Sequence, residues 1–151
     1  MASVQRSVQI KASPEETMAF LSDAGRWPEW YPGMTEIHVA EPFPEKGGKA
    51  IFKVKSAGIS MQITETVLDY QPGKLHVFRM EGMLSGQARW ELTPEGDGTR
   101  LTATFGYVLR GGVFGRIADA LVVERMNARS LEEGLENCKA LVERPVAVSS
   151  S

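Results

Sequence analysis

The sequence predicts an α+β fold in which a curved antiparallel sheet of seven strands is wrapped around one long C-terminal helix. Between residues 35 and 110, apolar and polar residues alternate almost throughout, and glycines and prolines mark short turns. Connections this short join only antiparallel neighbours. After Gly111 and Gly112 the apolar residues recur at steps of three and four, which is typical of an amphipathic helix.

The first elements have clear start signals. Residues 4–11 alternate between apolar and polar side chains, which predicts the first strand. Ser13, Pro14 and Glu16 then combine an N-cap, a proline in the first helical turn and the acidic partner of a capping box. We therefore expect a short helix to about residue 22, and a second short helix at residues 26–30.

The rest of the chain supplies six more strands and the long helix. The strands are expected at residues 36–41, 50–56, 59–70, 74–81, 87–93 and 100–110. No proline interrupts residues 113–144, so one helix can cover this range, with a possible kink at Gly134. Residues 1–144 are expected to form a single ligand-binding domain, followed by a flexible tail at residues 145–151.

Composition narrows the function. The 17 basic and 19 acidic residues give a net charge of −2, which argues against nucleic acid as a partner. The single cysteine, Cys138, cannot form an intramolecular disulfide, and the N-terminus lacks the apolar core of a secretory signal. No window approaches the 18–20 apolar residues of a membrane span. We therefore expect a cytoplasmic protein without an integral membrane segment.

The fold class itself predicts a cavity. A strongly curved sheet cannot touch a straight helix along its whole length, so space opens between them, and bulky inward-facing side chains should line it. The residues expected to line this cavity and bind a ligand are Trp30, Phe52, Val54, Met61, Ile63, Glu65, Arg79, Trp90, Phe105, Tyr107, Leu121 and Glu124. For each apolar residue taken alone, a closed core is the competing interpretation.

The charged residues among these candidates would say most about the chemistry of the cavity. Glu65 shares the parity of the apolar residues of its strand, Arg79 shares that of Leu75 and Val77, and Glu124 lies beside the helix stripe. A carboxyl group buried in such a cavity would have a raised pKa and could serve as an acid or a base. The alternative is a solvated charge or an ion pair at the rim.

Cofactors and metals find no support in the sequence. His38 and His76 lie outside any metal-binding spacing, so neither a metal nor a cofactor is expected. Both histidines alternate with apolar neighbours and are expected to face solvent, with a general base at the cavity mouth as the weaker alternative. Cys138 falls on the apolar stripe of the long helix and should pack as a small hydrophobic residue.

The order of elements and four sequence strings resemble the helix-grip fold of the superfamily that joins START lipid-transfer domains, the major birch-pollen allergen and the polyketide cyclase/dehydrase proteins (SRPBCC). The strings are SPEE at residues 13–16, WPEWYPG at 27–33, LDYQPGKL at 68–75 and GDGTRLT at 96–102. The resemblance covers residues 4–143 and is greatest to the polyketide cyclase/dehydrase branch. It implies a ligand cavity, but no catalytic residues, because the superfamily shares none.

Three functional hypotheses follow. The first is binding or transport of a small hydrophobic molecule, such as a lipid, a quinone or a polyketide-like compound, by a monomer or homodimer. The second is a polyketide cyclase or dehydratase that uses the same cavity. The third is a protein-interaction or toxin–antitoxin-like factor.

Overall fold

The computed structural model describes residues 2–56, 58–109 and 117–144. Its elements are β1 (Ala2–Ile10), α1 (Pro14–Leu21), a 3₁₀ turn (Ala24–Arg26), α2 (Trp27–Trp30), β2 (Met34–Ala40), β3 (Lys49–Ser56), β4 (Ile59–Gln71), β5 (Leu75–Gly82), β6 (Leu84–Glu95), β7 (Gly98–Leu109) and α3 (Ile117–Glu143). The expected tail at residues 145–151 and the start of the expected long helix at 113–116 lie outside the described residues.

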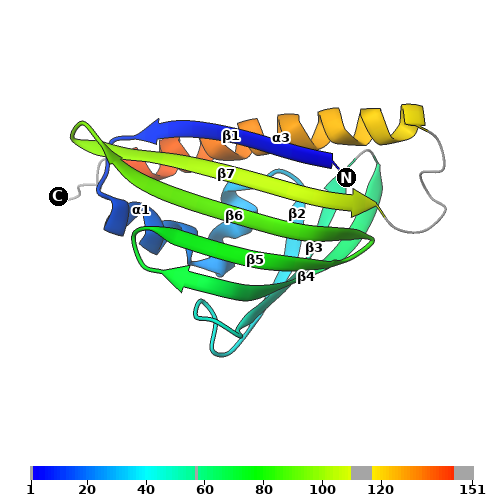
Figure 1. Cartoon of the computed structure of the whole chain (residues 1–151), viewed down its shortest axis with the longest axis horizontal. Coiled ribbons are helices and arrows are strands. Elements are labelled where there is room, and N and C mark those ends of the chain that lie inside the picture. Colours follow the sequence, from blue (N-terminus) through cyan, green and yellow to red (C-terminus); the bar gives the residue numbers. More distant parts are fainter. Residues whose placement is uncertain (1, 57, 110–116, 145–151) are drawn as a thin grey trace.

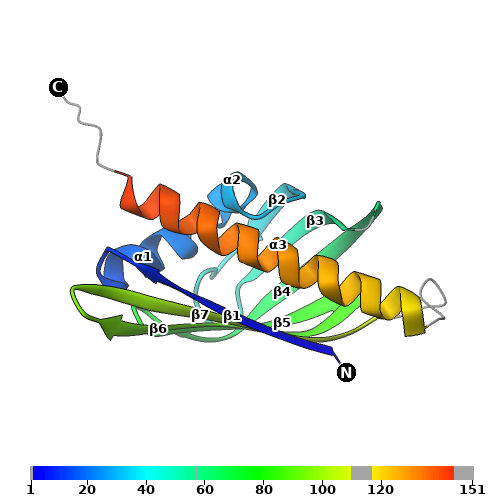
Figure 2. The same cartoon turned by 90° about the horizontal axis from the view of Figure 1, so that it is seen from above.

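The seven strands form one antiparallel sheet in the order β1-β7-β6-β5-β4-β3-β2. The sheet curves, and α3 runs alongside β1 and crosses its concave side, while α1 and α2 lie at one end (Figures 1 and 2). This arrangement confirms the predicted helix-grip architecture, including the two short helices after the first strand.

The capping box predicted for α1 is present. The Ser13 hydroxyl accepts a hydrogen bond from the backbone N–H of Glu16 at 3.1 Å, and the Glu16 carboxylate accepts one from the backbone N–H of Ser13 at 3.2 Å. These two bonds satisfy donors that the first turn of a helix would otherwise leave unpaired. The same residues that mark the helix in the sequence therefore set its start.

Buried apolar side chains and polar contacts hold α3 against the sheet and α2. Leu131, Leu135 and Cys138 are buried, and burial raises the pKa of the Cys138 thiol to about 12, so it packs as an unreactive apolar group. On the exposed side, Arg6 of β1 pairs with Glu132 at 2.6 Å. The Asn137 amide donates a hydrogen bond to the Trp30 carbonyl oxygen at 3.0 Å, which ties α3 to α2.

Gly134 lies where α3 passes the end of α2, and α3 continues through it without interruption. A Cβ atom at this position would lie 3.4 Å from Tyr31 Cδ2 and 3.6 Å from Pro32 Cδ, which is ordinary van der Waals contact. We expect Gly134→Ala to raise the free energy of unfolding by up to about 1 kcal/mol, because alanine restricts the unfolded chain and favours the helix.

Urea unfolding checks this expectation, with Gly134→Leu as the contrasting variant. The larger side chain must displace Tyr31 and Pro32, so it should lower the free energy of unfolding by about 1–3 kcal/mol. A clear loss of stability in Gly134→Ala would show that the space beside Gly134 does not accept a methyl group.

The inward phase of β5 differs from the prediction. His76, Phe78 and Met80 are buried, whereas Arg79 is exposed on the opposite phase and lies 3.9 Å from Glu81. Both phases of this strand carry apolar residues, so alternation alone does not identify the inner one. The register of the neighbouring strand also shifts between Val67 and Asp69.

The prediction of a solvent-facing His76 is therefore wrong, whereas His38 is exposed as expected. The His76 ring lies 4.5 Å from the Tyr70 ring and 4.2 Å from the Phe78 ring, between centroids. Its Nε2 atom is 3.0 Å from the Pro44 carbonyl oxygen. Burial lowers the pKa of His76 to about 4, although this hydrogen bond opposes the shift. His76 is thus a neutral core residue that holds the β2–β3 loop.

Candidate functional site

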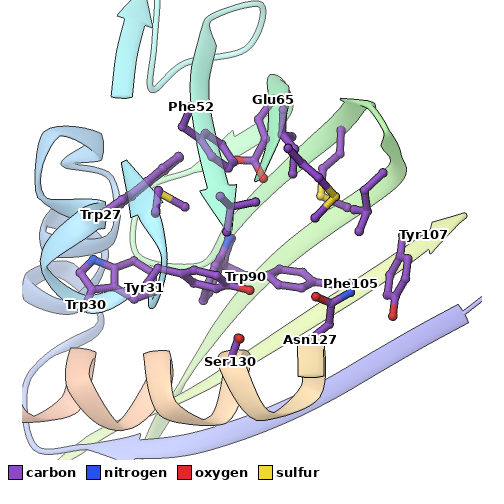
Figure 3. Close-up of a pocket in the computed structure, with 16 residues that line it drawn as sticks. Trp27, Trp30, Tyr31, Phe52, Glu65, Trp90, Phe105, Tyr107, Asn127 and Ser130 are labelled. Atoms are coloured by element: carbon purple, nitrogen blue, oxygen red, sulfur yellow. The ribbon is translucent and has the colours of Figure 1, made fainter. Parts of the chain in front are cut away.

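A cavity of about 70 Å³ lies between the concave face of the sheet, α2 and α3 (Figure 3). Its wall consists mainly of aromatic and apolar side chains. The lining residues are Trp27, Trp30, Tyr31, Met34, Phe52, Val54, Met61, Ile63, Glu65, Met80, Leu84, Trp90, Phe105, Tyr107, Asn127 and Ser130. The chain has three tryptophans, and all of them line this cavity.

Strand alternation positions most of the wall. Phe52 on β3 pairs with Ile63 on β4, and both side chains point into the cavity. Along each strand, every second residue points inward and the residues between them point away from the cavity. Towards the β1 edge of the sheet, Phe105 and Tyr107 come from alternate positions of β7 and line the same cavity. The sheet therefore presents a continuous apolar surface to the helix.

Edge-to-face ring contacts fix the aromatic part of the wall. The Trp90 ring lies 5.7 Å from the Trp30 ring and 6.0 Å from the Phe105 ring, at interplanar angles of 85° and 81°. Trp27 packs edge-on against Phe52 at 5.9 Å, and its indole N–H donates a hydrogen bond to the Leu21 carbonyl oxygen at 2.8 Å. Such contacts favour defined ring orientations, so the wall is preorganised.

Among the described residues of this wall, Glu65 is the acidic one. Its side chain points into the cavity (Figure 3), and the residue is only 7% exposed. Within the described part of the chain, its carboxyl group has no hydrogen-bond or ion-pair partner. Burial raises the pKa of Glu65 to about 8, because the charged form would lose its hydration without a compensating partner.

Four further polar side chains of the described residues reach the cavity. Tyr31 stands at the end of α2 and Tyr107 on β7, whereas Asn127 and Ser130 project from α3 (Figure 3). Burial raises the pKa of Tyr31, and the nearby Glu65 carboxylate adds to this effect. Burial also raises the pKa of Tyr107, an effect that the neighbouring Asn127 side chain opposes. Both tyrosines are therefore neutral hydroxyl groups that can donate and accept hydrogen bonds.

Residues 1–143 match the family model described as polyketide cyclase/dehydrase and lipid transport. The chain belongs to this family. Members of the polyketide cyclase/dehydrase and lipid transport family bind small hydrophobic ligands, and the cavity of this chain has the aromatic character that such ligands need. No curated protein matches the sequence.

Solved structures share the fold of this family member. The protein TTHA0849 from Thermus thermophilus is 21% identical with a TM-score of 0.80, covering 93% of this chain and 97% of its own. The ZhuI aromatase/cyclase from Streptomyces sp. R1128 is 18% identical with a TM-score of 0.83, covering 99% and 98%. Ara h 8.0201 is 9% identical with a TM-score of 0.69, covering 93% and 97%. At these identities the likeness concerns the fold.

The structure places nine of the twelve predicted site residues on the cavity wall of this polyketide cyclase/dehydrase family member; their part in ligand binding stays a prediction. They are Trp30, Phe52, Val54, Met61, Ile63, Glu65, Trp90, Phe105 and Tyr107. Arg79 lies outside the cavity because its strand has the opposite phase. Glu124 is half-buried and lines a separate surface hollow with Val4 and Arg6. The side chain of Leu121 lies outside the described residues.

Seven wall residues in the described part of the chain were not predicted: Trp27, Tyr31, Met34, Met80, Leu84, Asn127 and Ser130. Asn127 and Ser130 are three residues apart, so they share one face of α3, and two polar residues next to the apolar stripe were a usable signal. Met80 was missed for the same reason that Arg79 was included, the wrong phase of β5.

Neither a metal site nor a membrane span is found in the described part of the chain. Residues 2–56, 58–109 and 117–144 contain no group of three His, Cys, Asp or Glu side chains that could hold a metal ion. No helix within the same ranges is both long and apolar enough to cross a bilayer.

Proposed function

We propose that this protein binds a small, largely apolar molecule in the cavity, with the polar end of the ligand against Glu65. The observation that carries the proposal is the pairing of an aromatic wall with one buried carboxyl group that lacks a partner among the described residues. Apolar walls with a few convergent polar groups are typical of small-molecule sites. The family match supports the same function.

Cavity size constrains the ligand. The space of about 70 Å³ is several times what one water requires. It is smaller than the roughly 150 Å³ cavity that holds benzene in an engineered protein core. A ligand with a single ring therefore needs more room than this space offers, so side chains of the wall must move to admit it, and longer lipids require a larger movement.

We assign binding to residues 1–144, acting as a monomer or homodimer in the cytoplasm. The net charge of −2 supports a small molecule over nucleic acid as the partner.

A cyclase or dehydratase reaction is the second candidate, and Glu65 is the observation that favours it. A carboxyl group with a pKa of about 8 can donate and accept protons near neutral pH. The walls would hold a polyketide-like chain close to that group. Catalysis would show as turnover of such a chain in addition to saturable binding.

Titration with benzyl alcohol at pH 6 tests the binding proposal. Because all three tryptophans line the cavity, we expect a saturable change in tryptophan emission on excitation at a wavelength that the alcohol does not absorb. Val54→Phe should weaken binding at least about tenfold, because the larger side chain occupies the cavity.

Lys55→Phe is the matched control, since it adds the same ring at the next position of β3, where the side chain is exposed. Its affinity should equal that of the unchanged protein. Equal affinity of the Val54→Phe variant would place the ligand outside the cavity and overturn the proposal.

A further inference from the structure

The cavity wall combines aromatic rings with an isolated acidic group. Seven of its lining residues are aromatic: Trp27, Trp30, Tyr31, Phe52, Trp90, Phe105 and Tyr107. Aromatic faces attract cations, and carboxylates pair with them. The described lining includes no lysine, arginine or histidine. The protein thus presents two kinds of cation-binding group and no cation from its own described wall.

We propose, building on the function proposed above, that the preferred ligand is an amine whose ammonium group pairs with the Glu65 carboxylate while its apolar part packs against the aromatic rings. Glu65 is more than nine-tenths buried and points into the cavity without a partner among the described residues. An ammonium group supplies the missing counter-charge. It also relieves the cost of a buried, unpaired carboxylate.

Among the described residues, the surroundings of Glu65 add no competing charge. Its neighbours across the sheet are Ala50 on β3 and Met80 on β5, which are apolar. The titratable groups that share the cavity wall in the described residues are the hydroxyls of Tyr31 and Tyr107, whose raised pKa values keep them neutral.

The described residues that α3 contributes to the cavity wall are polar but uncharged. Asn127 and Ser130 bring oxygen atoms to this side of the cavity, and such atoms can accept hydrogen bonds from an ammonium group. Ligands with a negative charge or no charge should gain less binding energy in this cavity than an ammonium ligand. A carboxylate ligand, such as a fatty acid, meets another carboxyl group and no described cation. A neutral ligand with a hydroxyl group can hydrogen-bond to the polar wall residues, but it supplies no counter-charge to Glu65.

This pairing predicts a pH dependence. An ammonium group needs the ionised form of Glu65, so its binding releases a proton below pH 8. Affinity for an amine should therefore rise by about tenfold per pH unit from pH 6 towards pH 8, and then level off. Affinity for a neutral ligand of the same shape should not rise, because it requires no ionisation.

Benzylamine, benzyl alcohol and phenylacetate test the inference, since they share one ring and differ in charge. We would titrate each at pH 6, 7, 8 and 9, using tryptophan emission and calorimetry. At pH 8 the amine should bind at least about tenfold more tightly than the alcohol, and phenylacetate should bind most weakly. In Glu65→Gln the preference for the amine and its pH dependence should disappear, so that the amine and the alcohol bind with similar affinity.

Glu81→Gln is the matched control, because Glu81 is exposed on the neighbouring strand. This variant should keep the amine preference. If the alcohol binds in the cavity but the amine binds no more tightly at pH 8, the amine inference falls and the binding function stands. If none of the three binds, both fall. A preference that survives in Glu65→Gln overturns the role of Glu65.

Discussion

Glu65→Gln is expected to raise the free energy of unfolding by on the order of 3 kcal/mol at pH 7. The pKa of Glu65 is about 8 in the folded protein, compared with an ordinary value of 4.5. Between these values the folded protein keeps a proton that the unfolded chain has lost, so stability falls as pH rises. At pH 7, about 2.5 units above the ordinary pKa of 4.5, this lowers the free energy of unfolding by about 1.36 kcal/mol for each of those units. Glutamine does not ionise and avoids this loss.

Urea unfolding at pH 4.5, 6, 7 and 8 measures the effect. The difference between Glu65→Gln and the unchanged protein should be near zero at and below pH 4.5, and grow until about pH 8. Glu81→Gln, on the exposed face, should follow the unchanged protein at every pH. Parallel curves for Glu65→Gln and the unchanged protein would show that the carboxyl group is not isolated from water.

His76 should make the protein less stable as pH falls, whereas Glu65 makes it less stable as pH rises. The expected loss is about 3 kcal/mol between pH 6.5 and pH 4. Its pKa is about 4 in the folded protein, compared with an ordinary value of 6.5. Across this window the unfolded chain binds a proton that the folded protein excludes, so stability falls as pH falls. The buried ring between Tyr70 and Phe78 has no room to gain a hydrated charge.

The two groups oppose each other from pH 4.5 to 6.5, so the effect of His76 is best measured in the Glu65→Gln background. There, stability should rise steadily from pH 4 to 6.5. Adding His76→Phe should remove this rise, even though loss of the hydrogen bond to Pro44 lowers the overall stability. Adding His38→Gln, at an exposed position, should leave the rise unchanged. An unchanged rise in the His76→Phe variant would assign it to other groups.

Local signals were sufficient where one face of a strand is clearly polar. Phe52 and Val54 alternate with lysines on β3, and Met61 and Ile63 alternate with polar residues on β4, so parity correctly placed them inside. The capping box at Ser13 likewise identified the start of α1. These predictions depend on neighbours within one element, which the sequence displays directly.

Parity failed on β5, where both phases carry apolar residues. The sequence has Leu75 and Val77 on one phase and Phe78 and Met80 on the other. Taking the first phase as the inner one predicted an exposed His76 and an inward Arg79, the reverse of the structure. What decided the inner phase was pairing with β4 and contact with the β2–β3 loop through Pro44. Those contacts join residues far apart in the chain, so alternation within one strand cannot report them.

The sequence by itself determined the fold class, the order of the elements and the inward direction of Glu65, because each depends on periodicity and turn chemistry. Only the tertiary structure decided that a space remains beside Glu65 and that no described cation reaches it. These properties depend on how far α3 stands from the sheet, on the approach of α2 at Gly134, and on which side chains of other elements meet the carboxyl group. The chemistry of the site is therefore set by what surrounds one residue, and that surrounding forms only when distant segments pack together.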